Sequence, residues 1–215
     1  MTSKEVRAWI ESTGIVAAVR VSSAEEALFA AEAVIAGGIS IVEITFTIPQ
    51  ATHVIAQLAK RNSQVVVGAG GVTDTALARQ CLDAGARFLT SDGLHLSVIE
   101  FAVKQDVIVF PGALTPTEVM TAWEAHSDFV KVVPCSQIGG EVYIASLRRM
   151  FPHIPLIAAG GVSQKNASKF IFAGATALGI GRELLPIEAL RLRQAGRISN
   201  LARRFLSYVK SGREH

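Results

Sequence analysis

The sequence predicts a single (β/α)8 barrel domain over residues 1–215, with a short N-terminal helix and an extra C-terminal helix. Two observations support this fold. Short apolar segments rich in β-branched residues recur about eight times, and their starts lie roughly 20 to 27 residues apart, the length of one strand, one helix and two loops. Segments with helical periodicity lie between them, and this alternation is typical of a parallel sheet covered by helices.

The expected elements follow one another without a linker or a change in composition. A short amphipathic helix is expected at residues 3–12. Strands are expected at residues 15–20, 39–45, 65–69, 88–91, 107–110, 129–133, 156–159 and 177–180. Helices are expected between them, for example at residues 24–36, 75–84 and 117–124. The segment from Leu184 to the end should hold the eighth barrel helix and the extra helix.

Residues typical of helix ends support these boundaries. Helix N-caps are expected at hydroxyl or carboxylate side chains, namely Ser22 or Ser23, Thr73 or Asp74, Thr115 and Ser163. Helices are expected to end at glycines, namely Gly37-Gly38, Gly85 and Gly174. The alternative fold is a doubly wound sheet. It would be expected to carry a G-x-G-x-x-G turn after an early strand, where this chain has Val21-Ser22-Ser23.

Composition narrows the functional classes. The net charge of +3 is small, and the arginines in residues 191–213 lie at helical spacing, as on a solvated helix face rather than a nucleic-acid-binding surface. The two cysteines and five histidines show no metal-ligand spacing, so neither a metal nor another cofactor is expected. No segment resembles a signal sequence or a membrane span, which predicts a cytoplasmic protein without a membrane or nucleic-acid partner.

One lysine interrupts an otherwise apolar strand, Phe129-Val130-Lys131-Val132-Val133. Burying an ammonium group costs free energy unless the group is paired or loses its proton. A neutral lysine amine is a nucleophile that can condense with a ketone to form a Schiff base. The alternative is a lysine at a strand end whose stem is buried and whose charged head reaches water.

Few other charged residues lie near the C-terminal ends of the expected strands, where (β/α)8 barrels carry their active sites. Arg20 ends the first strand and Glu43 lies late in the second. Side chains alternate along a strand, so Glu43, Thr45 and Thr47 share one face if the strand continues that far. A carboxylate and an amine on opposite strands could then meet at the barrel mouth, either for catalysis or as a structural ion pair.

Two glycine clusters follow the seventh and eighth expected strands, Gly160-Gly161 and Gly179-Ile180-Gly181-Arg182. Loops at these two positions commonly bind phosphate in such barrels through backbone N–H groups. A Gly-Gly pair alone is a weak signal because glycine also serves tight turns, but the two positions together favour an anion site. Further close-approach turns follow the third and fifth strands, at Gly68-Ala69-Gly70-Gly71 and Pro111-Gly112.

These residues resemble those of the bacterial 2-keto-3-deoxy-6-phosphogluconate (KDPG) and 4-hydroxy-2-oxoglutarate (KHG) aldolases. The resemblance runs from about Ile15 to Leu185 and is carried by residues 15–20, 42–49, 68–70, 111–118 and 129–134 and by the two glycine clusters. It implies a homotrimeric, metal-independent aldolase in which Lys131 forms the Schiff base and Glu43 is the acid and base. The expected substrate-binding residues are Arg20, Thr47, Gly70, Gly71, Pro111, Gly160, Gly161, Gly181 and Arg182.

The chain departs from the family pattern around the expected site. Thr47 stands where many members have arginine, and Gly71 and Ala159 replace threonines. Asp92 stands where proline is usual, and Arg182 replaces a serine thought to contact phosphate. Losing hydroxyl donors and gaining a carboxylate should weaken binding of a doubly anionic keto acid, each lost hydrogen bond costing about 1 kcal/mol.

The expected function is cleavage of a 4-hydroxy-2-oxo acid, with KDPG as the first candidate, to pyruvate and an aldehyde such as glyceraldehyde 3-phosphate. One alternative is another reaction through a pyruvate enamine, such as KHG cleavage or oxaloacetate decarboxylation. A second alternative is a non-catalytic barrel that binds a sugar acid or a phosphate.

Overall fold

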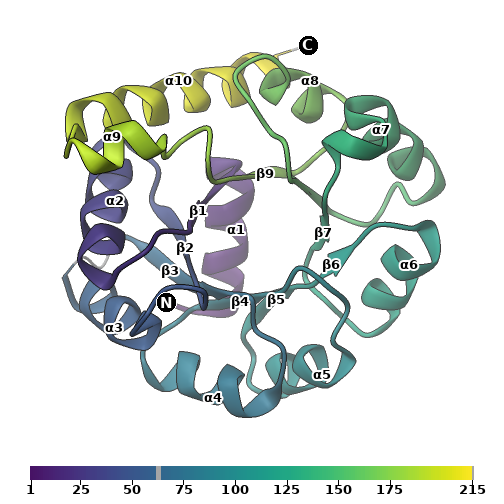
Figure 1. Cartoon of the computed structure of the whole chain (residues 1–215). Helices are drawn as coiled ribbons and strands as arrows, with labels where there is room; N and C mark the ends of the chain where they lie inside the picture. The colour runs from purple at the N-terminus through teal and green to yellow at the C-terminus, as the bar shows by residue number, and fades with distance from the viewer. Residues whose placement is uncertain (62–63, 215) are drawn as a thin grey trace.

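The computed structural model describes residues 1–61 and 64–214, and it confirms the expected (β/α)8 barrel (Figure 1). The strands are β1 (Ile15–Val19), β2 (Ile41–Thr45), β3 (Val66–Gly70), β4 (Phe88–Thr90), β5 (Ile108–Phe110), β6 (Gly112–Ala113), β7 (Val130–Val132), β8 (Leu156–Ala159) and β9 (Ala177–Ile180). The helices are α1 (Ser3–Thr13), α2 (Ala24–Ala36), α3 (Ala51–Arg61), α4 (Thr75–Asp83), α5 (Leu96–Lys104), α6 (Pro116–Glu124), α7 (Gly140–Met150), α8 (Ala167–Phe172), α9 (Ile187–Arg191) and α10 (Ala195–Arg213), with a short 3-10 helix at Ser136–Ile138.

The strands lie in the order β5-β4-β3-β2-β1-β9-β8-β7-β6, and every recorded pairing is parallel. β5 pairs with β4 and β6 pairs with β7, while only Pro111 separates β5 from β6 along the chain. Residues 108–113 therefore act as the fifth of the eight expected barrel strands. This strand is divided in two because proline lacks the N–H group that a continuous ladder needs.

An apolar layer fills the N-terminal end of the barrel. Residues early in the strands pack together there, among them Val16, Ile41, Val66, Phe88, Phe129 and Ile157. Val6 and Ile10 of α1 belong to the same cluster, so α1 closes this end of the barrel (Figure 1). A larger apolar cluster lies between the strands and the surrounding helices. Both faces of the strands are thus buried, which accounts for their nearly continuous apolar sequences.

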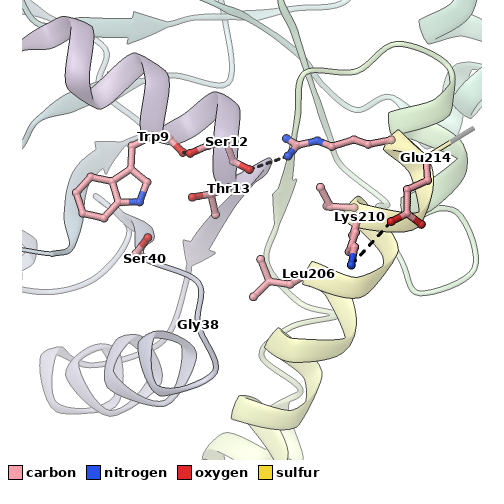
Figure 2. A pocket seen from close by; sticks show the side chains of 10 residues that line it. Trp9, Ser12, Thr13, Gly38, Ser40, Leu206, Lys210 and Glu214 are labelled. Carbon is pink, nitrogen blue, oxygen red and sulfur yellow. Dashed lines mark hydrogen bonds and ion pairs between the residues drawn. The ribbon is translucent and has the colours of Figure 1, made fainter.

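A hollow of about 450 Å³ lies beside α1 at this closed end (Figure 2). Its lining includes Trp9 and Ser12 of α1 and Leu206 and Lys210 of α10. Lys210 forms an ion pair with Glu214 at 3.8 Å at the edge of this hollow. The C-terminal ends of the strands lie at the opposite end of the barrel, which is the end that carries active sites in this fold.

Most of the expected helix caps are present. Ser23, Asp74 and Thr115 each accept a hydrogen bond from a backbone N–H group of the first helical turn. The expected cap at Ser163 is wrong, because α8 begins at Ala167 and its N-cap is Asn166, three residues after Ser163. The Ser163 backbone N–H group instead donates to Oδ1 of Asn166 at 2.7 Å, so the chain turns once more before the helix starts.

α10 is the eighth helix of the ring, because it packs against α8 on one side and α2 on the other (Figure 1). Ser199 of α10 donates to the carbonyl oxygen of Ala33 at 2.8 Å, which fixes α10 against α2. The extra helix is the five-residue α9, which precedes α10 instead of following it. Within residues 1–61 and 64–214, no helix is long and apolar enough to span a membrane.

Candidate active site

Glu43 and Lys131 lie inside the barrel, one layer above the apolar layer. Ile41 and Phe129 belong to that layer, and side chains alternate along a strand, so Glu43 and Lys131, each two residues further on, also face the interior. Glu43 is 5% exposed and Lys131 is 4% exposed. They belong to the second and sixth of the eight barrel strands, so their side chains approach each other from opposite sides of the barrel.

Lys131 is held at this position by the fifth barrel strand. Its backbone N–H group donates to the carbonyl oxygen of Pro111 at 2.9 Å, and Gly112 is its neighbour in the parallel ladder. Pro111, expected to contact substrate, therefore acts here through its backbone on the strand that carries Lys131. The flanking residues Val130 and Val132 are fully buried, which makes the lysine the polar exception in this strand.

The ammonium group of Lys131 is paired with Asp92. Nζ of Lys131 lies 2.8 Å from Oδ1 of Asp92, and Oδ2 of Asp92 accepts a hydrogen bond from Arg20 at 3.1 Å. The Lys131 side chain is 6% exposed, unlike a lysine whose head projects from an open strand end, while the Asp92 side chain is 54% exposed. Sequence reasoning identified Arg20 and Lys131 but missed Asp92 as their common partner.

The backbone around Asp92 is packed closely against the strand beside Lys131. A Cβ atom on Gly112 would lie 2.4 Å from the carbonyl carbon and oxygen of Asp92, so only glycine fits at this contact. Ser91, the preceding residue, donates from Oγ to the carbonyl oxygen of Gly93 at 2.7 Å and closes the turn. The sequence does contain a sign that Asp92 belongs to the site, because Asp92 is a charged residue directly after the fourth expected strand.

Two carboxyl groups near Lys131 have pKa values displaced in opposite directions. Burial raises the pKa of Glu43, although the positive charge of Lys131 opposes part of the rise. Partial burial also acts to raise the pKa of Asp92, but the charge of Lys131 and hydrogen bonds from Lys131 and Arg20 outweigh it, and the pKa of Asp92 is lowered. Two carboxyl groups whose pKa values are displaced in opposite directions can serve as the acid and the base of one site.

Glu43 leans towards the neighbouring strand β3. A Cβ atom on Gly70 would lie 2.0 Å from Oε1 of Glu43, so Gly70 supplies the space that the carboxyl group occupies. Thr45 of the same strand donates to the carbonyl oxygen of Val19 at 3.0 Å, and its hydroxyl lies 2.9 Å from that of Thr47. β2 ends at Thr45, but this contact keeps Thr47 beside the mouth.

The glycine turn after β8 is packed against the loop after β7. Gly160 and Gly161 have φ values of 78° and 87°, a region that favours glycine. A Cβ atom on Gly161 would lie 2.6 Å from Oγ of Ser136, and that hydroxyl donates to the Gly161 carbonyl oxygen at 2.8 Å. This packing is a structural reason for the Gly-Gly pair, in addition to any role in binding an anion.

Comparisons with known proteins identify the family. A family model described as KDPG and KHG aldolase matches residues 6–201. The chain belongs to this family. It is a carbon–carbon lyase of the aldolase class.

One curated relative is the 2-dehydro-3-deoxy-6-phosphogalactonate aldolase of Escherichia coli strain K12. It is 30% identical over 208 residues, which cover 96% of this chain and 98% of the relative. The structure of the Legionella pneumophila KDPG aldolase, with pyruvate captured as a covalent carbinolamine, has a TM-score of 0.84 at 25% identity and covers 92% of this chain and 96% of that chain. A cage designed by fusing symmetric oligomeric domains has a TM-score of 0.85 at 28% identity, over 94% of this chain and 73% of that chain.

The expected departure from the family pattern at Gly71 has a local structural reason. Gly71 has a φ of 76°, where a β-branched residue such as threonine is strained. The backbone of the turn after β3 is thus in a left-handed conformation that glycine adopts without strain. Ala159, the residue before the Gly-Gly turn, is buried, and its carbonyl oxygen accepts a hydrogen bond from the Cys135 backbone at 2.8 Å.

Arg182 lies apart from the paired charges at the mouth. With Gln164, Arg197 and Arg204 it lines an outer groove of about 780 Å³ between the loop after β8 and helices α9 and α10. Within the described parts of the chain, the Arg182 side chain has no recorded hydrogen bond or ion pair. Its neighbour Gly181 follows β9, at the position expected for the second anion-binding turn. The described residues include no group of three or more His, Cys, Asp or Glu side chains placed to hold a metal ion.

Proposed function

We propose that this aldolase cleaves a 4-hydroxy-2-oxo acid to pyruvate and an aldehyde through a Schiff base on Lys131, with KDPG as the leading candidate substrate. The observation that carries the proposal is the pair of buried inward-facing residues, Lys131 and Glu43, at the active-site end of the barrel. A buried amine beside a buried carboxyl group suits imine formation followed by proton transfer.

The reaction begins when the neutral amine of Lys131 attacks the keto carbon of the substrate, and loss of water leaves a protonated imine. Ionised Glu43 removes the proton of the C4 hydroxyl group, the C3–C4 bond breaks, and its electron pair moves into the imine to form an enamine. The aldehyde leaves. Glu43 returns its proton to C3, and addition of water to the imine releases pyruvate and the free lysine.

The remaining expected site residues divide between the two ends of the substrate. The keto acid carboxylate would lie on the side of the barrel mouth formed by the ends of β1, β2 and β3, where Arg20, Thr47, Gly70 and Gly71 are found. Arg20 supplies the positive charge there. Gly160, Gly161, Gly181 and Arg182 follow the last two strands and would bind the distal phosphate. The guanidinium of Arg182 suits bidentate contact with phosphate.

Steady-state kinetics test the substrate class. Pyruvate release should be faster from KDPG, or from its C4 epimer, than from the matched unphosphorylated keto acids. Arg182→Ser should raise KM roughly tenfold for the phosphorylated substrate and little for the unphosphorylated one, because a charge-assisted hydrogen bond is lost.

The control is Arg191→Ser, which removes an exposed arginine that does not line the groove. Equal KM changes for both substrates, or none, would make Arg182 a surface residue and favour an unphosphorylated substrate. Faster turnover of KHG or oxaloacetate would favour the alternative pyruvate-enamine reactions. Binding of sugar acids without any turnover would favour a non-catalytic barrel.

We also propose a cytoplasmic homotrimer. The similar chain in a cage built from symmetric oligomeric domains supports self-association. Large apolar side chains that are exposed in the single chain, among them Val142, Phe172 and Ile187, offer surface for contacts between subunits. Light scattering should give about three times the chain mass of 22.8 kDa. A mass equal to one chain at micromolar concentration would contradict the trimer.

A further inference from the structure

We propose that Asp92 is a second catalytic carboxylate, which takes the proton of Lys131 and later returns it to the carbinolamine, so that imine formation depends on Asp92 and C–C cleavage on Glu43. The inference rests on the proposed function, because it requires Lys131 to be the Schiff-base residue. It assigns separate steps to the two carboxyl groups beside one amine.

The contact with the reacting atom is direct. Oδ1 of Asp92 lies 2.8 Å from Nζ of Lys131, within the range for proton transfer without an intervening water. Glu43 influences the same amine through its charge, but no hydrogen bond between Glu43 and Lys131 is recorded among residues 1–61 and 64–214. Of the two carboxyl groups, Asp92 is therefore the one in position to exchange a proton with the free lysine.

The position of Asp92 is set by the fold rather than by a flexible surface loop. Its backbone packs on Gly112, whose strand is paired with β7 at Lys131, and the Ser91 hydrogen bond closes the turn that carries it. The side chain is half exposed, in contrast to the buried Glu43. A proton on Asp92 can thus exchange directly with solvent.

Arrival of the keto acid favours the first proton transfer. In the free protein Arg20 and Lys131 both bind Asp92, which stabilises its ionised form. The substrate carboxylate is attached to the carbon that Lys131 attacks, so it enters next to Asp92 and competes for Arg20. A like charge nearby and the loss of a cationic partner both increase the proton affinity of a carboxylate. Asp92 then accepts a proton from the ammonium group of Lys131.

The later steps balance with no further reagent. The neutral Nζ atom forms a bond to the keto carbon, the carbonyl π pair moves to oxygen, and that oxygen takes the second proton from nitrogen. Asp92, now protonated, gives its proton to the resulting hydroxyl group of the carbinolamine. The C–O bond breaks, water leaves, and the nitrogen lone pair forms the C=N bond of the iminium ion. Asp92 is again ionised.

Single-turnover trapping separates the two carboxyl groups. The protein is mixed with pyruvate, quenched with borohydride at increasing times, and the covalently labelled fraction is measured. Asp92→Asn should slow labelling by roughly tenfold to a hundredfold. Glu43→Gln should label at nearly the wild-type rate but exchange the pyruvate methyl protons slowly. Asp83→Asn, which removes an exposed aspartate at the end of α4, is the matched control and should leave both rates unchanged.

A second variant distinguishes chemistry from loss of structure. Asp92→Ala should be slowed in the same way, and added formate should restore part of its labelling rate, whereas chloride at the same ionic strength should not. Labelling of Asp92→Asn at or above the wild-type rate, or an Asp92→Ala variant that formate does not rescue, would overturn the role of Asp92. A wild-type protein that is never labelled would instead contradict the Schiff-base function itself.

Discussion

Lys131→Ala should abolish both pyruvate-dependent labelling and aldol cleavage. In the proposed mechanism the amine bonds to the keto carbon, and no general acid or base can replace a missing nucleophile. Turnover should fall by roughly 10⁴-fold or more, as for other enzymes that lose their nucleophile. Borohydride trapping and steady-state pyruvate release both measure the effect.

The control for this variant is Lys104→Ala, which removes an exposed lysine in the last turn of α5. It should retain full labelling and activity. Lys131→Met keeps a long apolar stem in the barrel and separates loss of the amine from loss of packing. Activity retained in both Lys131 variants, with unchanged circular dichroism spectra, would remove Lys131 from the mechanism.

Glu43→Gln should lower the turnover number by about 10²-fold or more while pyruvate still forms the imine. Glutamine keeps the size of the side chain that fits over Gly70, and it loses only the titratable proton. Exchange of the pyruvate methyl protons, followed by NMR in heavy water, measures this step without the aldehyde. Unchanged exchange would show that another group carries out the proton transfer.

The pH dependence of cleavage should report the ionisation of Glu43. Burial raises the pKa of Glu43. The proposed mechanism requires its ionised form for cleavage. Activity should therefore rise with pH along a limb that lies above the usual glutamate range of about 4 to 5. The charges that act on Glu43 are those of Lys131, Asp92 and Arg20. The Asp92→Asn variant removes one of them and therefore tests how far the Asp92 charge contributes to the pKa of Glu43. Glu43→Gln should lose this limb, and a limb that persists in it would belong to another group.

Much of the fold follows from the spacing of the apolar segments. Eight short β-branched segments with helices between them leave few ways to bury both faces of a parallel sheet, and the barrel is one of them. The details that failed depend on tertiary contacts. Ser163 has the side chain of a helix cap, but Asn166 takes that position. α10 lies in the ring because it packs against α8 and α2, which the helical periodicity of residues 184–215 does not reveal.

The site was predictable where it depends on strand alternation. Glu43 and Lys131 face the interior because they lie two residues beyond Ile41 and Phe129. The ion pair of Lys131 was missed because Asp92 is distant in sequence and follows another strand. Its contact depends on the close approach of its backbone to Gly112. Arg182 likewise required the structure, since its sequence position beside Gly181 does not show that it lines the outer groove with α10.

In the proposed mechanism, Lys131 is the single residue that bonds covalently to pyruvate. The most direct measurement treats the wild-type protein with pyruvate and borohydride and locates the added mass by peptide mass spectrometry. One reduced pyruvate per chain, on the peptide that contains Lys131, is the predicted result. An unmodified chain, or a modified lysine at any other position, would contradict it.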